Sequence, residues 1–142
     1  MGTQSLGSRA DGAYLYTFFW WPGTPQDAPA AKGAEIDAYA SAMKQAGQSK
    51  WINSNAAFGF ADVVTLARAL AGMHSSALTG PSVEAGLRAT KGLNAFLGGP
   101  ITCNHAAFPG QSACSTGVLM YKVDGSGQLR LTSSGWVKPA AA

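Results

Sequence analysis

The sequence has few charged residues, because Lys, Arg, Asp and Glu occupy only 12% of its 142 positions. The ten basic residues are scattered without a run, and the net charge is +3. Nucleic-acid-binding proteins instead gather Lys and Arg along one face. We therefore expect no nucleic-acid partner and interpret the charges as a solvated surface.

Long apolar runs are also missing, since no stretch approaches the roughly 20 residues of a membrane-spanning helix. Residues 13–21 are apolar, but they lack a basic start, and Pro22 and Gly23 follow where a signal peptide would have its small-residue cleavage site. We interpret this stretch as a strand. We expect no export signal within the chain itself, although one could belong to sequence upstream of Met1.

The motifs of common enzyme classes are absent: Gly-x-Ser-x-Gly, the P-loop, His-Glu-x-x-His and Gly-x-Gly-x-x-Gly. The two histidines are His74 and His105, and His105 could form a nucleophilic pair with Cys103 or Cys114. Asp62 is the one acid in a strongly apolar setting, where a solvated carboxylate is the ordinary explanation. We expect no catalytic residue, no cofactor and no enzymatic activity.

Cysteine is rare, and the two cysteines lie in one segment rich in Gly, Ser, Ala and Pro. A disulfide between Cys103 and Cys114 would add about 2–3 kcal/mol of stability and would indicate an oxidising compartment. The alternative is a pair of free thiols. Zinc needs four ligands at suitable spacing, whereas Cys103, His105 and Cys114 are three at irregular spacing, so we expect no metal site.

The residues that are present predict a mixed α/β chain. The predicted elements are a buried aromatic strand at 13–19, helices at 33–46, 55–71 and 81–91, and a hairpin with strands at 117–123 and 129–132. Helix 55–71 is apolar on nearly every side and is predicted to be mostly buried. The lone strand could join the hairpin in a three-stranded sheet with helices on one face. Alternatively, its partner strands belong to a larger protein.

Two local patterns suggest a binding site. Trp20 and Trp21 are adjacent at the end of the first strand, and neighbouring strand side chains point to opposite faces. At least one should therefore line a cleft or an interface, unless it covers an edge of the core. Asn53, Ser54 and Asn55 lie at the start of helix 55–71, where free backbone N–H groups receive anionic groups well. Ordinary N-capping explains the same three residues.

Five segments in order resemble one protein family: DGAYLYTFFWWPG, IDAYASAMKQAG, SNAAFGFADVVTLARALAGM, TGPSVEAGLRATKGLNAFLGGPITC and CSTGVLMYKVDGSGQLRLTSSGWV. Over residues 11–137 they are similar to the C-terminal part of a type I periplasmic (substrate-binding) protein of the branched-chain amino-acid-binding, ABC transporter family. The resemblance identifies them as a strand crossing between lobes, paired helices, a further helix with the next hinge crossing, and a closing hairpin.

The resemblance implies a two-lobed α/β fold that closes on its ligand like a hinged trap. The chain, 1–142, would be one C-terminal segment, with the crossing strand and lobe I helices in 11–100 and the hinge crossing and lobe II hairpin in 101–137. The residues it places at or near the ligand are Asn55, Phe58, Trp20 and Trp21. Some members of the family carry a cysteine pair after the last crossing, which fits Cys103 and Cys114.

The function implied is that of the ligand-binding component, as a fragment, of an ABC importer. Its partners would be an amino acid or amide and a transporter permease, in the periplasm or at the cell surface. The family is more than twice as long, so the sheet edges of this piece would be open to the missing N-terminal lobe or to self-association. The alternative function is a structural, self-assembling protein that reuses the half-fold without binding a ligand.

Overall fold

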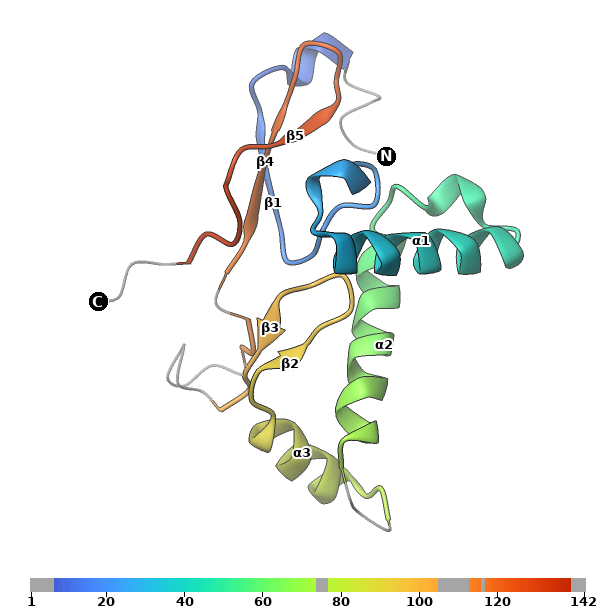
Figure 1. The fold of residues 1–142 in the computed structure, drawn as a ribbon, viewed down its shortest axis with the longest axis vertical. Coiled ribbons are helices and arrows are strands. Elements are labelled where there is room, and N and C mark those ends of the chain that lie inside the picture. Colours follow the sequence, from blue (N-terminus) through green and yellow to red (C-terminus); the bar gives the residue numbers. More distant parts are fainter. Residues whose placement is uncertain (1–6, 74–76, 105–112, 116, 139–142) are drawn as a thin grey trace.

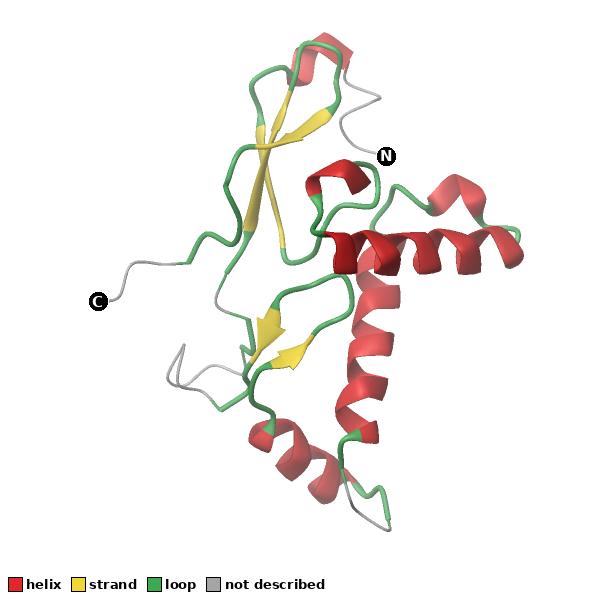
Figure 2. Cartoon of the chain, viewed as in Figure 1, coloured by secondary structure: helices red, strands yellow, loops and turns green. Residues whose placement is uncertain are grey.

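The computed structural model describes residues 7–73, 77–104, 113–115 and 117–138. Its helices and strands are β1 (Tyr14–Thr17), α1 (Ala30–Gln45), α2 (Ala56–Ala71), α3 (Gly80–Ala89), β2 (Leu93–Asn94), β3 (Pro100–Ile101), β4 (Leu119–Val123) and β5 (Leu129–Leu131). In Figure 1 the sheet of β1, β4 and β5 lies at one end of the molecule and α3 at the other. The helix α2 runs along one side, and the short strands β2 and β3 lie between α3 and the main sheet (Figure 2).

The main sheet is antiparallel, three-stranded and ordered β1-β4-β5. Thr17 of β1 lies opposite Leu119, and Val123 of β4 lies opposite Leu129. Alternate residues of β4 (Leu119, Tyr121 and Val123) are fully buried, as the two-residue period of a strand requires. The lone strand therefore does join the C-terminal hairpin, and the mixed α/β class is confirmed.

The prediction that the first strand is buried was wrong for most of its residues, although Thr17 and Phe19 are buried. Tyr14 and Tyr16 are 63% and 64% exposed, and Leu15 is 38% exposed. Tyr14 and Tyr16 share one face of the sheet because side chains alternate along a strand. Their aromatic character favours a strand, but it carries no information about whether another element covers that face.

The first helix begins at Ala30 with Pro29 at its N-cap, earlier than the predicted start at 33. Lys32, predicted to lie in a loop, is in the first turn and buried. Its ammonium donates hydrogen bonds to the Glu35 carboxylate (2.9 Å) and to the Ala95 carbonyl (2.7 Å). The Ala95 carbonyl is 63 positions away in the sequence, so this partner of Lys32 could not be predicted from local pattern.

The second helix was predicted correctly in extent but not in burial. Asn55 is the N-cap and Gly72 the C-cap. Phe58, Val63 and Leu66 are 46%, 69% and 44% exposed, so the prediction of burial on nearly every side was wrong. The face that packs inward carries the small buried residues Ala57 and Ala61 instead. An apolar composition thus coexists with one uncovered helix face.

A short hairpin of β2 and β3 was not predicted, because two-residue strands leave no periodic signal. Leu93 pairs with Ile101 and Asn94 with Pro100. Phe96 in the connecting loop is buried and packs against the Phe60 ring on α2. The loop thereby reaches into the core that the helices and the main sheet share.

The predicted third helix is confirmed as α3, shorter at its C-terminal end. Its start is fixed by a capping box in which the Ser82 backbone N–H donates to the Thr79 hydroxyl and the Thr79 N–H donates to the Ser82 hydroxyl. Within the described ranges, no helix combines the length and the apolar character needed to cross a bilayer.

Cys103 and Cys114 are joined by a disulfide, as predicted. The Thr102 backbone N–H donates to the Cys114 carbonyl (2.9 Å), and the Cys103 N–H donates to the Thr90 carbonyl at the end of α3 (3.1 Å). The disulfide is compatible with an extracellular or periplasmic location, where such bonds persist.

Candidate functional site

A cleft of about 770 Å³ lies where four segments of the chain meet. These are strand β1, the loop that follows it, the segment ahead of α2, and the turn between β4 and β5. The lining residues are Leu15, Trp21, Gly23, Thr24, Gln26, Trp51, Asn53, Ser54, Asn55, Ala56, Gly127, Gln128 and Leu129.

One wall of the cleft is formed by Trp21, whose backbone is hydrogen-bonded to strand β4. The Trp21 backbone N–H donates to the hydroxyl of Tyr121 (3.2 Å), which is fully buried in β4, and burial raises the pKa of this tyrosine. The Trp21 ring stacks on Phe19 with ring centroids 5.9 Å apart and planes 25° apart. The Thr24 N–H then donates to the Trp21 carbonyl (3.0 Å) and turns the chain. The indole is therefore oriented by both backbone and ring contacts.

The opposite wall consists of Trp51 and the residues that lead into α2. The Trp51 carbonyl accepts hydrogen bonds from the Tyr39 hydroxyl of α1 (3.4 Å) and from the Ser54 hydroxyl (2.5 Å). The Ser54 hydroxyl also accepts the Ala56 backbone N–H (3.1 Å). Asn55 occupies the N-cap, but its side chain makes no capping hydrogen bond. Capping therefore explains Ser54 and leaves the amide of Asn55 available.

The third wall is the β4–β5 turn, which Asp124 organises. One oxygen of its carboxylate accepts hydrogen bonds from the Ser126 hydroxyl (2.6 Å) and from the Gln128 backbone N–H (3.0 Å). The other accepts from the Arg130 guanidinium (3.0 Å). The hydrogen bonds of Ser126, Gln128 and Arg130 lower the pKa of Asp124 to about 2. Gly127 adopts a φ of 77°, a conformation that favours glycine.

The lining residues of the cleft include no ionisable side chain. They combine two indoles, two leucines, two hydroxyls and the four carboxamides of Gln26, Asn53, Asn55 and Gln128. Within the described part of the chain, these four carboxamides have no hydrogen-bond partner. Lys50 is not a lining residue, but its ammonium lies 5.2 Å from the centroid of the Trp51 ring.

The structure brings two of the four predicted ligand-contacting residues, Trp21 and Asn55, to this cleft. Trp20 is 6% exposed, packs edge-on against Trp136 with centroids 6.1 Å apart, and donates its backbone N–H to the Leu97 carbonyl (2.7 Å). The expectation that one of the adjacent tryptophans lines a cleft is therefore met by Trp21.

Phe58, the fourth predicted residue, lies one turn into α2 and is 46% exposed. Its ring is 6.1 Å from that of Phe19, and it is not among the residues that line the cleft. Sequence reasoning missed Trp51, Gln26 and Gln128. Trp51 lies two positions before the polar run at 53–55 and was the one with a local signal. The other two come from a loop and a turn with no binding pattern.

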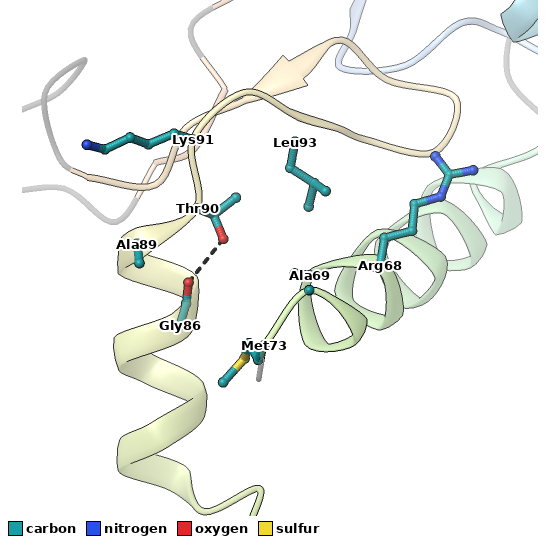
Figure 3. A pocket seen from close by; sticks show the side chains of 9 residues that line it. Arg68, Ala69, Met73, Gly86, Ala89, Thr90, Lys91 and Leu93 are labelled. Atoms are coloured by element: carbon teal, nitrogen blue, oxygen red, sulfur yellow. Dashed lines mark hydrogen bonds between the residues drawn. The ribbon is translucent and has the colours of Figure 1, made fainter. Parts of the chain in front are cut away.

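A second cavity, of about 560 Å³, lies between the C-terminal ends of α2 and α3 and strand β2. Figure 3 shows Met73 and Leu93 toward the space between the helices, while Lys91 extends away from it. The Met73 side chain occupies the position where a Cβ on Gly86 would project, and the Thr90 hydroxyl donates to the Gly86 carbonyl (3.2 Å). This cavity contains none of the residues that the sequence indicated.

Among the described residues, no three His, Cys, Asp or Glu side chains gather where they could hold a metal ion. His74 and His105 lie outside the described residues, so the alternatives that depend on them stay untested. The nucleophilic pair with His105 needs a free thiol, whereas both cysteines are in the disulfide. Asp62 is exposed on α2, and partial burial raises its pKa.

Comparison with protein-family models, with curated proteins and with solved structures found no match to this chain.

Proposed function

We propose that the chain binds a small polar ligand in the cleft between Trp21 and the start of α2, as the ligand-binding part of a type I periplasmic binding protein that serves an ABC importer. The observation that carries this proposal is the meeting of Trp21 and Asn55 in one cleft of about 770 Å³. Binding sites for small molecules typically combine such concave shape with apolar walls and a few polar groups.

The position of the cleft in the chain supports the hinged-trap interpretation. Its walls include residues 51–56, which the resemblance assigns to lobe I, and Gly127–Leu129, which it assigns to lobe II. A ligand held between such segments would contact both lobes and favour the closed arrangement. In this scheme Trp21 stands at the crossing strand and supplies the flat apolar wall next to the hinge.

The cellular setting follows from the same proposal. The Cys103–Cys114 disulfide is compatible with the periplasm or the cell surface, where an ABC permease would be the partner. We therefore place the protein on the outer side of the membrane with the permease. Amino acids and amides are the ligand classes to test first.

The test is a thermal-unfolding series with a panel of amino acids and amides. A ligand that binds only the folded state stabilises it by about 2.7 kcal/mol at one hundred times its Kd. We expect Trp21→Ala and Asn55→Ala to reduce the ligand-dependent shift. Asn94→Ala is the matched control, because it removes an exposed carboxamide on β2, outside the cleft. If no member of the panel shifts the unfolding transition, the proposal fails.

A second function, self-assembly, is favoured by the uncovered apolar surfaces. Phe58, Val63 and Leu66 expose one face of α2. Within the described residues, β1 pairs with β4 on one side only, which leaves the other edge available for another strand. Uncovered edges and apolar faces of this kind promote association between chains.

Light scattering over a concentration series tests self-assembly. We expect the chain to associate as its concentration rises, and Val63→Lys to reduce this association. Val63 is 69% exposed, so the substitution leaves the core packing intact. Asp37→Lys is the control, because it changes charge at an exposed position on α1, away from this face. A monomer at high concentration would argue against self-assembly.

A further inference from the structure

The chemistry of the cleft walls restricts the ligand further than shape alone. Every lining side chain is either apolar or a neutral hydrogen-bonding group. An amino acid carries a carboxylate and an ammonium, and removing either from water without a partner costs several kcal/mol. The cleft would therefore need a specific group for each charge.

The group most suited to a carboxylate, the N-terminus of α2, is already occupied. The Ala56 N–H donates to the Ser54 hydroxyl (3.1 Å) and the Ala57 N–H to the Ser54 carbonyl (3.1 Å). The Phe58 N–H donates to the Asn55 carbonyl (3.1 Å). An anion at this helix end would have to displace these internal acceptors, so the free N–H groups that the sequence suggested are not free in the folded chain.

The group most suited to an ammonium is also engaged. Asp124 lies in the turn that forms one wall, but its carboxylate accepts hydrogen bonds from Ser126, Gln128 and Arg130. Its charge is balanced by the Arg130 guanidinium, 3.0 Å away. A ligand ammonium at this position would compete with an established ion pair.

The groups without partners are neutral. The amides of Gln26, Asn53, Asn55 and Gln128 lack partners within the described residues, and so do the indole N–H groups of Trp21 and Trp51. Carboxamides both donate and accept hydrogen bonds, which matches ligand hydroxyl and carboxamide groups. The indole faces supply flat apolar surface for one side of a ring or an extended chain.

We infer that the ligand of this cleft is an uncharged molecule with hydroxyl or carboxamide groups arranged around one flat apolar face. The inference rests on the proposed function and narrows it, because a free amino acid would be a poor ligand. Specificity against charged analogues follows because no side chain that lines the cleft carries a charge.

The test compares neutral and charged ligands of matched shape by isothermal titration calorimetry on the full chain. The pairs are N-acetyl-leucinamide with N-acetyl-leucine, benzamide with benzoate, and methyl glucoside with methyl glucuronide. We expect the neutral member of the best-binding pair to bind at least about tenfold tighter, which corresponds to about 1.4 kcal/mol. We also expect its affinity to change little with added salt, since no charge is paired on binding. Comparison of the amide pairs with the sugar pair shows whether the cleft prefers carboxamide or hydroxyl groups on the ligand.

Substitutions in the cleft test the same inference through the affinity of the neutral ligand. Asn55→Ala and Gln128→Ala should each weaken the neutral ligand severalfold, while Asn94→Ala should leave its affinity unchanged. Equal or tighter binding of the charged member would overturn the inference and leave the proposed function standing. Failure of every neutral and charged compound to bind would overturn both.

Discussion

The carboxylate of Glu35 on α1 accepts the backbone N–H of Leu97, 2.6 Å away and separated from it by 62 positions in the sequence. The same carboxylate is 2.9 Å from the ammonium of Lys32 and 2.9 Å from the guanidinium of Arg68 on α2. Leu97 is fully buried with a φ of 57°, and its carbonyl accepts the Trp20 N–H. One carboxylate therefore ties α1 and α2 to the β2–β3 loop and, through Leu97, to the segment after β1.

We predict that Glu35→Gln lowers the free energy of unfolding by about 1–3 kcal/mol, because it leaves the buried Lys32 ammonium without its counter-charge. Urea denaturation measures the change. Asp37→Asn is the matched control, since it removes the same charge from an exposed position on α1 and should change stability by less than about 0.5 kcal/mol. Equal effects of the two substitutions would show that the Glu35 network contributes no specific stability.

The same network predicts a pH dependence. Burial acts to raise the pKa of Glu35, but the hydrogen bonds from Lys32, Leu97 and Arg68 outweigh it and hold the pKa below its ordinary value of 4.5. A carboxyl whose pKa is lowered by folding stabilises the protein above its unfolded-state pKa, and this contribution is lost as the pH falls through the folded-state pKa. Stability measured below pH 4.5 should therefore fall more steeply in the wild-type chain than in Glu35→Gln. An equal loss of stability with falling pH in the two chains would contradict this prediction.

Asp124 should titrate with a midpoint near pH 2, measured by the NMR shift of its side-chain carboxyl carbon. The hydrogen bonds from Ser126, Gln128 and Arg130 favour the ionised form. The turn should therefore be fully stabilised above the ordinary value of 3.8 and should lose this contribution as the pH falls toward 2. Arg130→Gln should move the midpoint upward, toward 3.8. An unchanged midpoint in that variant would refute the role of the guanidinium.

Substitution of the two adjacent tryptophans should lower stability by different amounts, because Trp20 lies in the core and Trp21 lines the cleft. Trp20→Ala removes a side chain that is 6% exposed and should cost about 3–5 kcal/mol of stability. Trp21→Ala should cost about 1–2 kcal/mol, because its ring is partly exposed and loses mainly its stacking on Phe19. Chemical denaturation of both variants compares them directly. A greater loss for Trp21→Ala would contradict the placement of the two rings.

Removal of the disulfide by Cys103→Ser with Cys114→Ser should lower stability by about 2–3 kcal/mol, because the bridge closes a loop with a sequence separation of 11. Denaturation with and without reductant measures this, and the double variant should not respond to reductant. A thiol count under denaturing, non-reducing conditions should find no free thiol in freshly purified protein. Two free thiols would refute the pairing.

Local patterns in the sequence were sufficient to predict the order of the first strand, the three helices and the C-terminal hairpin, but not the short strands β2 and β3. Ile36 and Tyr39 fall at helical spacing and are buried on α1, and Thr79 with Pro81 marks the start of α3. The Asp124–Gly127 run marks the hairpin turn. These signals are local because hydrogen bonding within a turn, capping and side-chain periodicity involve residues a few positions apart.

For the site, the sequence indicated Trp21 and Asn55 as candidates but could not show that they share a cleft, since they come from different segments. It also missed Gln26 and Gln128, whose positions depend on a loop and a turn. The partners of Glu35 were equally hidden, because Leu97 and Arg68 approach it only after α1, α2 and the β2–β3 loop have packed.

The sequence by itself determined the mixed α/β class, the order of the first strand and the three helices, the C-terminal hairpin and the disulfide-forming cysteines. Only the tertiary structure decided which apolar surfaces are covered: β1 and one face of α2 remain exposed although their composition predicted burial. The physical reason is that periodicity specifies which residues share a face, whereas burial of that face requires a partner surface from elsewhere in the chain.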